Sequence, residues 1–345
     1  MWCITNLEMD MFGSRIQDML GYRLVPLSLE DYCCSNAMEI ARAIVHTIPS
    51  GLSNVVSNLG KLYSIIDEKE VLGMVNNHLQ LLQAAQKGGS EFERETASLI
   101  MPYVYGTLAS IKASLCIASG EPIAQDIHYL YKLSEDADLM SRKLKYASML
   151  YCSGQFEEAA AILSHCKGLL CPDISHYCSC LGRECYRQTD NHLQKRLNTS
   201  TEKQVKRNYT TCVKFSKREA SCVPKHLRCE MNRTQTPLDK KLRNLDNHWM
   251  DLVVIDCVPF LYYLQYLIYR KLDDETGRFI AAANLESYVY QPEGILGHSD
   301  TAIHVFAHIF ELENQLHVAW SVYTESIKLF ITNNAARFHL QRLRG

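Results

Sequence analysis

The sequence lacks every complete short motif that identifies the common nucleotide-binding and hydrolytic enzymes. It contains no phosphate-binding loop ending in lysine, no nucleophile elbow and no dinucleotide-binding glycine fingerprint. One acid pair, Glu8 and Asp10, resembles the magnesium-binding pair of nucleotidyltransferases. In those enzymes a Gly-Ser turn precedes the pair, whereas here Gly13 and Ser14 follow it. The sequence therefore predicts no catalytic residue, and it favours a protein that is not an enzyme.

A secretory signal is also missing from the beginning of the chain. Met1–Phe12 carries Glu8 and Asp10 and has no basic segment followed by an apolar one. We therefore expect a cytoplasmic, reducing environment. The 14 cysteines would then be mostly thiols, which behave as small buried hydrophobic side chains.

Long apolar runs and a strong charge of one sign are absent as well. The most apolar stretch, Leu252–Tyr269, contains Asp256, Pro259 and Gln265, whereas a membrane span needs about 20 apolar residues with few charges. This stretch predicts a buried helix and no membrane contact. The net charge of −2 offers no general attraction for nucleic acid.

Helical periodicity dominates what is present. Apolar side chains recur with a period near 3.6, and alternation typical of strands is rare, which predicts an all-α fold. Pro102 lies inside one helical run and predicts a kink or a boundary there. The helices expected in the N-terminal third span residues 29–48, 55–66, 68–86 and 91–118.

Two segments follow the pattern of a tetratricopeptide unit, in which small residues lie where two paired helices approach each other. In the first segment Ala147 is followed by a turn at Gly154, and Phe156, Ala159 and Leu163 are the apolar positions of the second helix. In the second segment the matching positions are Ala307, Asn314, Leu316, Ala319 and Tyr323. Residues 259–290 predict a third, more degenerate hairpin. The expected fold is a stack of helical hairpins, a tetratricopeptide-like superhelix in two lobes.

The composition changes between these units. Residues 191–243 contain 14 Lys and Arg against four acids, and the apolar residues are sparse in the first half of this segment. Val213, Phe215, Val223 and Leu227 are available to pack in its second half. We predict four regions: an N-terminal helical region (1–134), a hairpin with a Cys/His cluster (135–190), a basic, partly disordered linker (191–243) and a C-terminal tetratricopeptide-like region (244–345).

The Cys/His cluster is the candidate metal site. Thiolate and imidazole ligands suit zinc, which takes four of them in a tetrahedron. The Cys-x-Cys spacing differs from the usual Cys-x2-Cys pair, so buried thiols and packing histidines are the alternative interpretation. A structural zinc is the only cofactor that the sequence suggests. Its predicted ligands are Cys171, His176, Cys178, Cys180 and Cys185.

Several runs in the C-terminal part resemble a known family. They are residues 144–166, 222–224, 249–256, 259–267, 296–299 and 333–336. Over roughly residues 135–345, the chain is similar to the helical C-terminal regions of large molluscan Mab-21-like proteins, relatives of the cyclic-GMP-AMP synthase nucleotidyltransferases. The resemblance implies a helical tail, while the domain that carries the Gly-Ser turn and the metal-binding acids in that family is not recognisable here.

These observations predict a non-catalytic scaffold whose helical groove binds a partner protein or peptide. The repeat-like units support this function, because stacked repeats create extended binding surfaces. The alternative is a fragment or regulatory half of a cyclic-GMP-AMP-synthase-like nucleotidyltransferase in innate immune nucleotide signalling, which rests on the family resemblance. Nucleic acid is not expected as a partner, since Tyr209 and Phe215 are the only aromatic residues within the basic segment.

Overall fold

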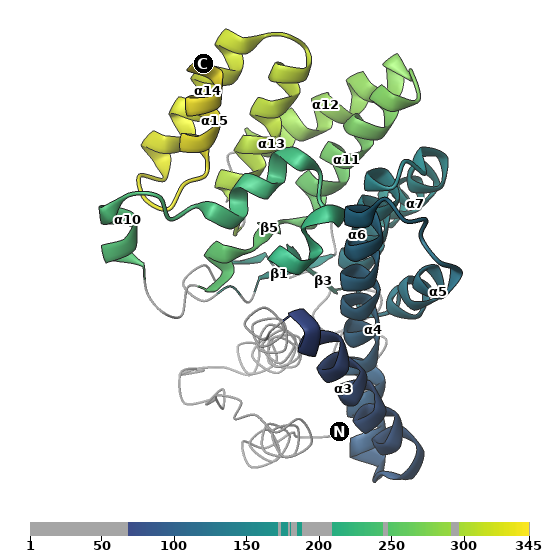
Figure 1. The fold of residues 1–345 in the computed structure, drawn as a ribbon. Coiled ribbons are helices and arrows are strands. Elements are labelled where there is room, and N and C mark those ends of the chain that lie inside the picture. Colours follow the sequence, from purple (N-terminus) through teal and green to yellow (C-terminus); the bar gives the residue numbers. More distant parts are fainter. Residues whose placement is uncertain are drawn as a thin grey trace, which may run out of the picture.

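A computed structural model of the chain describes residues 68–171, 174–178, 180, 185–187, 209–243, 248–290 and 297–344 (Figure 1). The helices predicted at 29–48 and 55–66, the Glu8–Asp10 pair and the first half of the basic segment lie outside these residues. The described part is predominantly helical, so the predicted fold class is confirmed. Its helices are α3 (Glu68–Gly88), α4 (Glu91–Ser119), α5 (Gln125–Ser134), α6 (Ser141–Cys152), α7 (Phe156–Leu169), α10 (Pro237–Leu242), α11 (Cys257–Lys271), α12 (Glu275–Val289), α13 (Ser299–Leu312), α14 (Leu316–Leu329) and α15 (Ala336–Arg344), with the 3-10 helices η3 (Lys217–Cys222), η4 (Lys225–Asn232) and η5 (His248–Asp251).

Both predicted repeat units form helical hairpins, α6–α7 and α13–α14. Their small residues Ala147, Ala159, Ala307 and Ala319 are fully buried, as the pattern requires. The predicted third hairpin is also present, as α11–α12. These three hairpins confirm the helical pairing inferred from the spacing of small and large side chains.

The turns of the three hairpins have the same geometry. In each turn one residue adopts a left-handed backbone: Gly154 at φ 84°, Asp273 at φ 55° and Asn314 at φ 58°. The amide of the following residue donates to a carbonyl five residues earlier, with distances of 2.8, 2.9 and 2.8 Å for Gln155, Asp274 and Gln315. This is the hydrogen bond that closes many helix C-termini. Glycine, aspartate and asparagine are the residues that tolerate this backbone best.

We expect Gly154→Ala to lower the free energy of unfolding by about 1–2 kcal/mol, because a Cβ atom makes the left-handed backbone costly. No atom lies within 4 Å of that Cβ, so the cost is conformational and not steric. Gly168→Ala is the matched control, since Gly168 lies within α7 and also has open space around it. That change should raise stability by up to about 1 kcal/mol. Equal effects of the two substitutions in urea unfolding would contradict this account of the turn.

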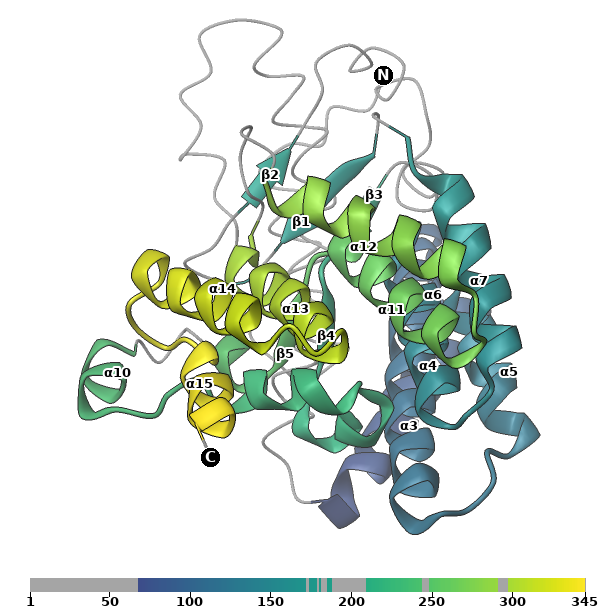
Figure 2. The same ribbon diagram turned by 90° about the horizontal axis from the view of Figure 1, so that it is seen from above.

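The three hairpins lie side by side although a long insertion separates the first from the second (Figure 2). Helix α11 contacts both α6 and α7, and α12 contacts α13. The insertion, residues 170–256, contains short strands that the all-α prediction did not include. They are β1 (Ser175–Cys178), β2 (Cys185–Arg187), β3 (Tyr209–Thr211), β4 (Val213–Phe215) and β5 (Val253–Ile255).

The strands form two small sheets. In the first, β1 pairs antiparallel with β2 and parallel with β3; in the second, β4 pairs antiparallel with β5. Strand β5 occupies the start of the stretch 252–269, and the helix predicted there begins only at Cys257. Val253–Ile255 are β-branched and fully buried, which suits a paired strand better than the first turn of a helix.

The second half of the basic segment is part of the hydrophobic core. Val213, Phe215, Val223 and Leu227 are fully buried, which confirms the prediction that these side chains pack. The Phe215 ring meets Phe260 of α11 edge-on, with 6.0 Å between ring centroids. The core is therefore continuous across the insertion and joins the first hairpin to the other two.

Helix α4 is the one helix in the described residues that is long and apolar enough to cross a membrane. Within its apolar window 61% is buried inside the protein itself, which favours a core helix. The helix continues through Pro102, so of the two outcomes predicted there, a kink or a boundary, the boundary is wrong. Ile100, Met101, Tyr103 and Val104 around the proline are buried, and their packing offsets the backbone hydrogen bond that proline cannot make.

Buried ion pairs attach the insertion to the first helices of the hairpins. Lys145 of α6 pairs with Glu219 of η3, and both side chains are buried. Arg233, which follows η4, donates to Asp300 of α13 at 2.5 Å and pairs with Glu230 at 2.8 Å. All three side chains of this second group have no exposed surface. Burying a charged side chain costs desolvation free energy, and the oppositely charged partner offsets this cost.

Candidate metal centre

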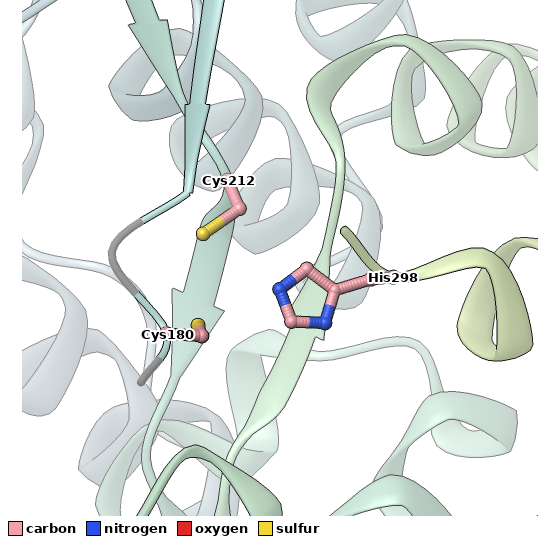
Figure 3. A group of neighbouring side chains, drawn as sticks. All are labelled: Cys180, Cys212 and His298. Carbon is pink, nitrogen blue, oxygen red and sulfur yellow. The ribbon is translucent and has the colours of Figure 1, made fainter. Parts of the chain in front are cut away.

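Cys180, Cys212 and His298 come together in the interior. One ligand atom of each residue lies within 4.8 Å of those of the other two. The side chains are 2%, 6% and 0% exposed, respectively. Figure 3 shows them around a common space, with the imidazole on the side opposite the two cysteines. Trp249 closes the site next to His298, with 5.4 Å between the ring centroids.

Each of these residues is positioned by a junction between elements. Cys212 links β3 to β4, so it lies where the two small sheets meet. Cys180 follows β1 by two residues, and β1 is paired with β3. His298 precedes α13, and its backbone amide donates to Asp256 at 3.3 Å. The site thus joins both sheets to the beginning of the α13–α14 hairpin.

The donor set suits zinc. Two thiolates and an imidazole are typical ligands of structural zinc sites, which are tetrahedral and closed to solvent. Zinc bonds of about 2.3 Å to sulfur and about 2.0 Å to nitrogen would place the ligand atoms roughly 3.5–3.8 Å apart. Groups already within 4.8 Å of one another therefore need only small shifts to bind the ion. A tetrahedral ion would take its fourth ligand from a further residue or from water.

A buried positive charge lies beside this site. The Arg233 guanidinium lies over the Trp249 ring, 5.1 Å from its centroid. Burial acts to lower the pKa of Arg233, but Asp300, Glu230 and Cys180 together raise it above its ordinary value. The arginine therefore keeps its positive charge in the interior, close enough to Cys180 to interact with it.

The predicted ligands are distributed differently. Cys180 belongs to the group of three, whereas Cys171 is exposed after the end of α7 and is not part of it. His176 lies on β1, half-buried and also outside the group. Cys178 and Cys185 face each other across the β1–β2 pair, although their side chains lie outside the described residues.

Sequence reasoning missed Cys212 and His298. Cys212 lies ten residues from the next cysteine, and the nearest cysteine to His298 is 41 residues away in the sequence. No local spacing signals that either residue is a ligand, because the usual zinc signatures depend on pairs that are close in the chain. Only the pairing of β1 with β3 and the placement of α13 bring the three residues together.

Comparisons with protein-family models, with curated proteins and with solved structures found no match to this chain. The interpretation of the site therefore depends on its own geometry and chemistry. All three ligand side chains are buried, so the surrounding core would shield a bound ion from solvent. The geometry thus favours a structural role.

Proposed function

We propose that this protein is a non-catalytic scaffold that binds another protein through its stacked helical hairpins. The observation that carries the proposal is a row of exposed side chains along α12, in the α11–α12 hairpin. Two of these side chains are aromatic. The insertion, which carries two residues of the candidate metal centre, shares one hydrophobic core with the hairpins. The partner is a protein or peptide, as the repeat-like architecture predicts.

The insertion covers the side of the hairpins formed by their first helices. Lys145 and Ser148 of α6 bind the η3 segment, with Ser148 donating to the Cys222 carbonyl at 2.7 Å. His304 of α13 bonds to Glu230 of η4 at 2.6 Å. Because the chain itself fills this side, we place the partner on the second helices and not in a groove between the first ones.

The exposed row consists of Phe279, Ala283 and Glu286 of α12 and of Tyr290, the residue that follows the helix. These positions recur at helical spacing and therefore share one side of the helix. Phe279 is 75% exposed and Tyr290 is 66% exposed, and Ile280 beside them is 44% exposed. Exposed hydrophobic side chains are ordinary when they are scattered, but a contiguous set marks an interaction surface. Aromatic residues are also the usual anchors of protein interfaces.

Phe279→Asp should abolish binding if Phe279 is an anchor. We expect partner affinity to fall at least about 30-fold, the effect of losing a residue worth roughly 2 kcal/mol. Tyr129→Asp is the matched control, because Tyr129 is an exposed aromatic residue on α5 with 60% of its surface accessible. Partners are captured with the parent chain and both variants, and their affinities are then measured with purified proteins. Recovery of the same proteins by the parent and Phe279→Asp would overturn the proposal.

The relationship to Mab-21-like proteins, and with it a role in nucleotide signalling, remains a proposal based on the sequence runs that carry the resemblance. None of the five described strands contains Asp or Glu, whereas nucleotidyltransferases hold their magnesium ions with acids on a strand. Within the described residues this favours the scaffold over the enzyme. A coding sequence upstream that contains a Gly-Ser turn followed by alternating acids would instead favour the nucleotidyltransferase reading. Cytoplasmic location is likewise proposed from the sequence.

A further inference from the structure

A second group of potential ligands lies between the α13–α14 hairpin and the C-terminal helix α15. His226 of η4, Glu311 of α13 and His339 of α15 each place one ligand atom within 4.8 Å of the other two. The imidazole of His226 is stacked between those of His308 and His339, with centroid distances of 3.7 and 4.0 Å. Residues from three distant parts of the sequence therefore meet at one point.

His339 is the most informative member of this group. Its side chain is 1% exposed, and neither ring nitrogen has a hydrogen-bond partner among the described residues. A neutral imidazole has one donor and one acceptor nitrogen, and leaving such groups buried without partners costs about 1–3 kcal/mol each. A bound cation would give one of these nitrogens a partner.

Glu311 supplies the negative charge. Its side chain is 8% exposed and accepts hydrogen bonds from the Tyr323 hydroxyl at 2.6 Å and from Arg342 at 2.7 and 2.6 Å. A carboxylate has about four lone-pair positions, so these bonds do not exhaust it. Arg342 is 51% exposed and has room to turn toward solvent when a cation enters.

We propose that His226, Glu311 and His339 form a binding site for a zinc-type transition-metal ion, separate from the cysteine-containing centre. Two imidazoles and one carboxylate are a donor set that zinc uses when three protein ligands leave one position open. The His226 and His339 rings lie nearly parallel, at 13°, so their in-plane lone pairs reach one ion only after one ring turns. The ion would then fasten α15 to η4 and α13, in addition to the Arg342–Glu311 pair. Tyr323 bonds to both His226 and Glu311, at 3.0 and 2.6 Å, and orients two of the three ligands.

Cobalt(II) distinguishes this site from the cysteine-containing centre. A cobalt ion bound to thiolate shows an intense sulfur-to-metal charge-transfer band, whereas one bound only to nitrogen and oxygen shows visible ligand-field bands alone. The full chain, stripped of metal, is titrated with Co²⁺ and then with Zn²⁺. The same titration of the Cys212→Ser variant isolates the histidine site, because Cys212 is a ligand only at the other centre.

In the Cys212→Ser background we expect one Co²⁺ to bind with ligand-field bands and no thiolate band. His339→Phe should weaken this binding at least about a hundredfold, since loss of an outer-shell partner alone costs roughly 10- to 100-fold. Glu311→Gln provides a second variant that keeps the shape of the side chain. His317→Phe is the matched control, because His317 is exposed on α14 and lies outside the group.

His339→Phe also tests whether His339 is a metal ligand or only a packing residue. If His339 has no hydrogen bond, the phenyl ring should leave the metal-free protein at least as stable as the parent, since an apolar replacement removes the unpaired nitrogens. In the Cys212→Ser background, Zn²⁺ should then raise the thermal midpoint of the protein that keeps His339 and of His317→Phe, but not that of His339→Phe. Metal binding that is unchanged by both His339→Phe and Glu311→Gln, or no Co²⁺ bound in the Cys212→Ser background, would overturn the proposal.

Discussion

Arg233→Met is expected to destabilise the protein by about 3–5 kcal/mol, the usual cost of removing one partner from a buried ion pair. The guanidinium donates to Asp300 at 2.5 Å and to the Thr301 hydroxyl at 2.7 Å, and it pairs with Glu230 at 2.8 Å. Methionine fills a similar volume but leaves both carboxylates without their cation. Because these carboxylates have no exposed surface, water cannot replace the lost charge. Urea unfolding of the parent and the variant measures the difference.

Arg243→Met is the matched control for this experiment. Arg243 also pairs with an aspartate, Asp251, but both side chains are partly exposed. An ion pair in contact with solvent contributes about 0–1 kcal/mol, so its loss should be small. Adding Asp300→Asn to Arg233→Met should restore part of the stability, because it removes one of the unpaired charges. If the two arginine variants lose equal stability, the buried pair is not what holds the insertion to α13.

Loss of zinc from the cysteine-containing centre is expected to have an effect of similar size. At a free zinc concentration about 1,000 times the dissociation constant, binding stabilises the folded state by about 4 kcal/mol. Cys212→Ser should therefore lower the free energy of unfolding by about that amount and reduce the zinc content by about one ion per chain. Elemental analysis of the purified protein, together with unfolding in the presence and absence of a chelator, measures both effects.

Cys116→Ser provides the control for this change. Cys116 is a partly buried thiol of α4 that lies outside both groups of ligands, so its substitution should leave the zinc content unchanged. The proposal fails if the parent chain holds less than about one zinc per four molecules, since a structural site should be nearly filled. It also fails if thiol titration shows that Cys180 and Cys212 are joined as a disulfide.

The hairpins are the part of the fold that local sequence pattern predicts well. Helix α4 begins at the predicted residue Glu91, where apolar periodicity and a Ser90 capping box coincide. The spacing of Ala147, Ala159 and Leu163 predicts the α6–α7 pair because each small residue marks a close approach of two helices. These signals depend on residues that are close together in the sequence, so they can be recognised without the tertiary structure.

The errors occur where distant packing overrides a local preference. Pro102 does not end α4, because the buried side chains on both sides of it hold the helix together. Val253–Ile255 form β5 because Val213–Phe215 are available as a partner strand. In both places the favourable contacts come from residues that are distant in the sequence. Local sequence patterns alone therefore misplace the end or the start of the helix.

The sequence by itself therefore determined the helical class, the three hairpins and their turns at Gly154 and Asn314, since these depend on residues close together in the chain. It also predicted metal ligands in the cysteine-rich region around Cys180. Only the tertiary structure decided which residues join Cys180, because Cys212 and His298 reach it through strand pairing and through the position of α13. The meeting of His226, Glu311 and His339 has the same origin: three elements distant in sequence pack against one another, and no spacing along the chain records that contact.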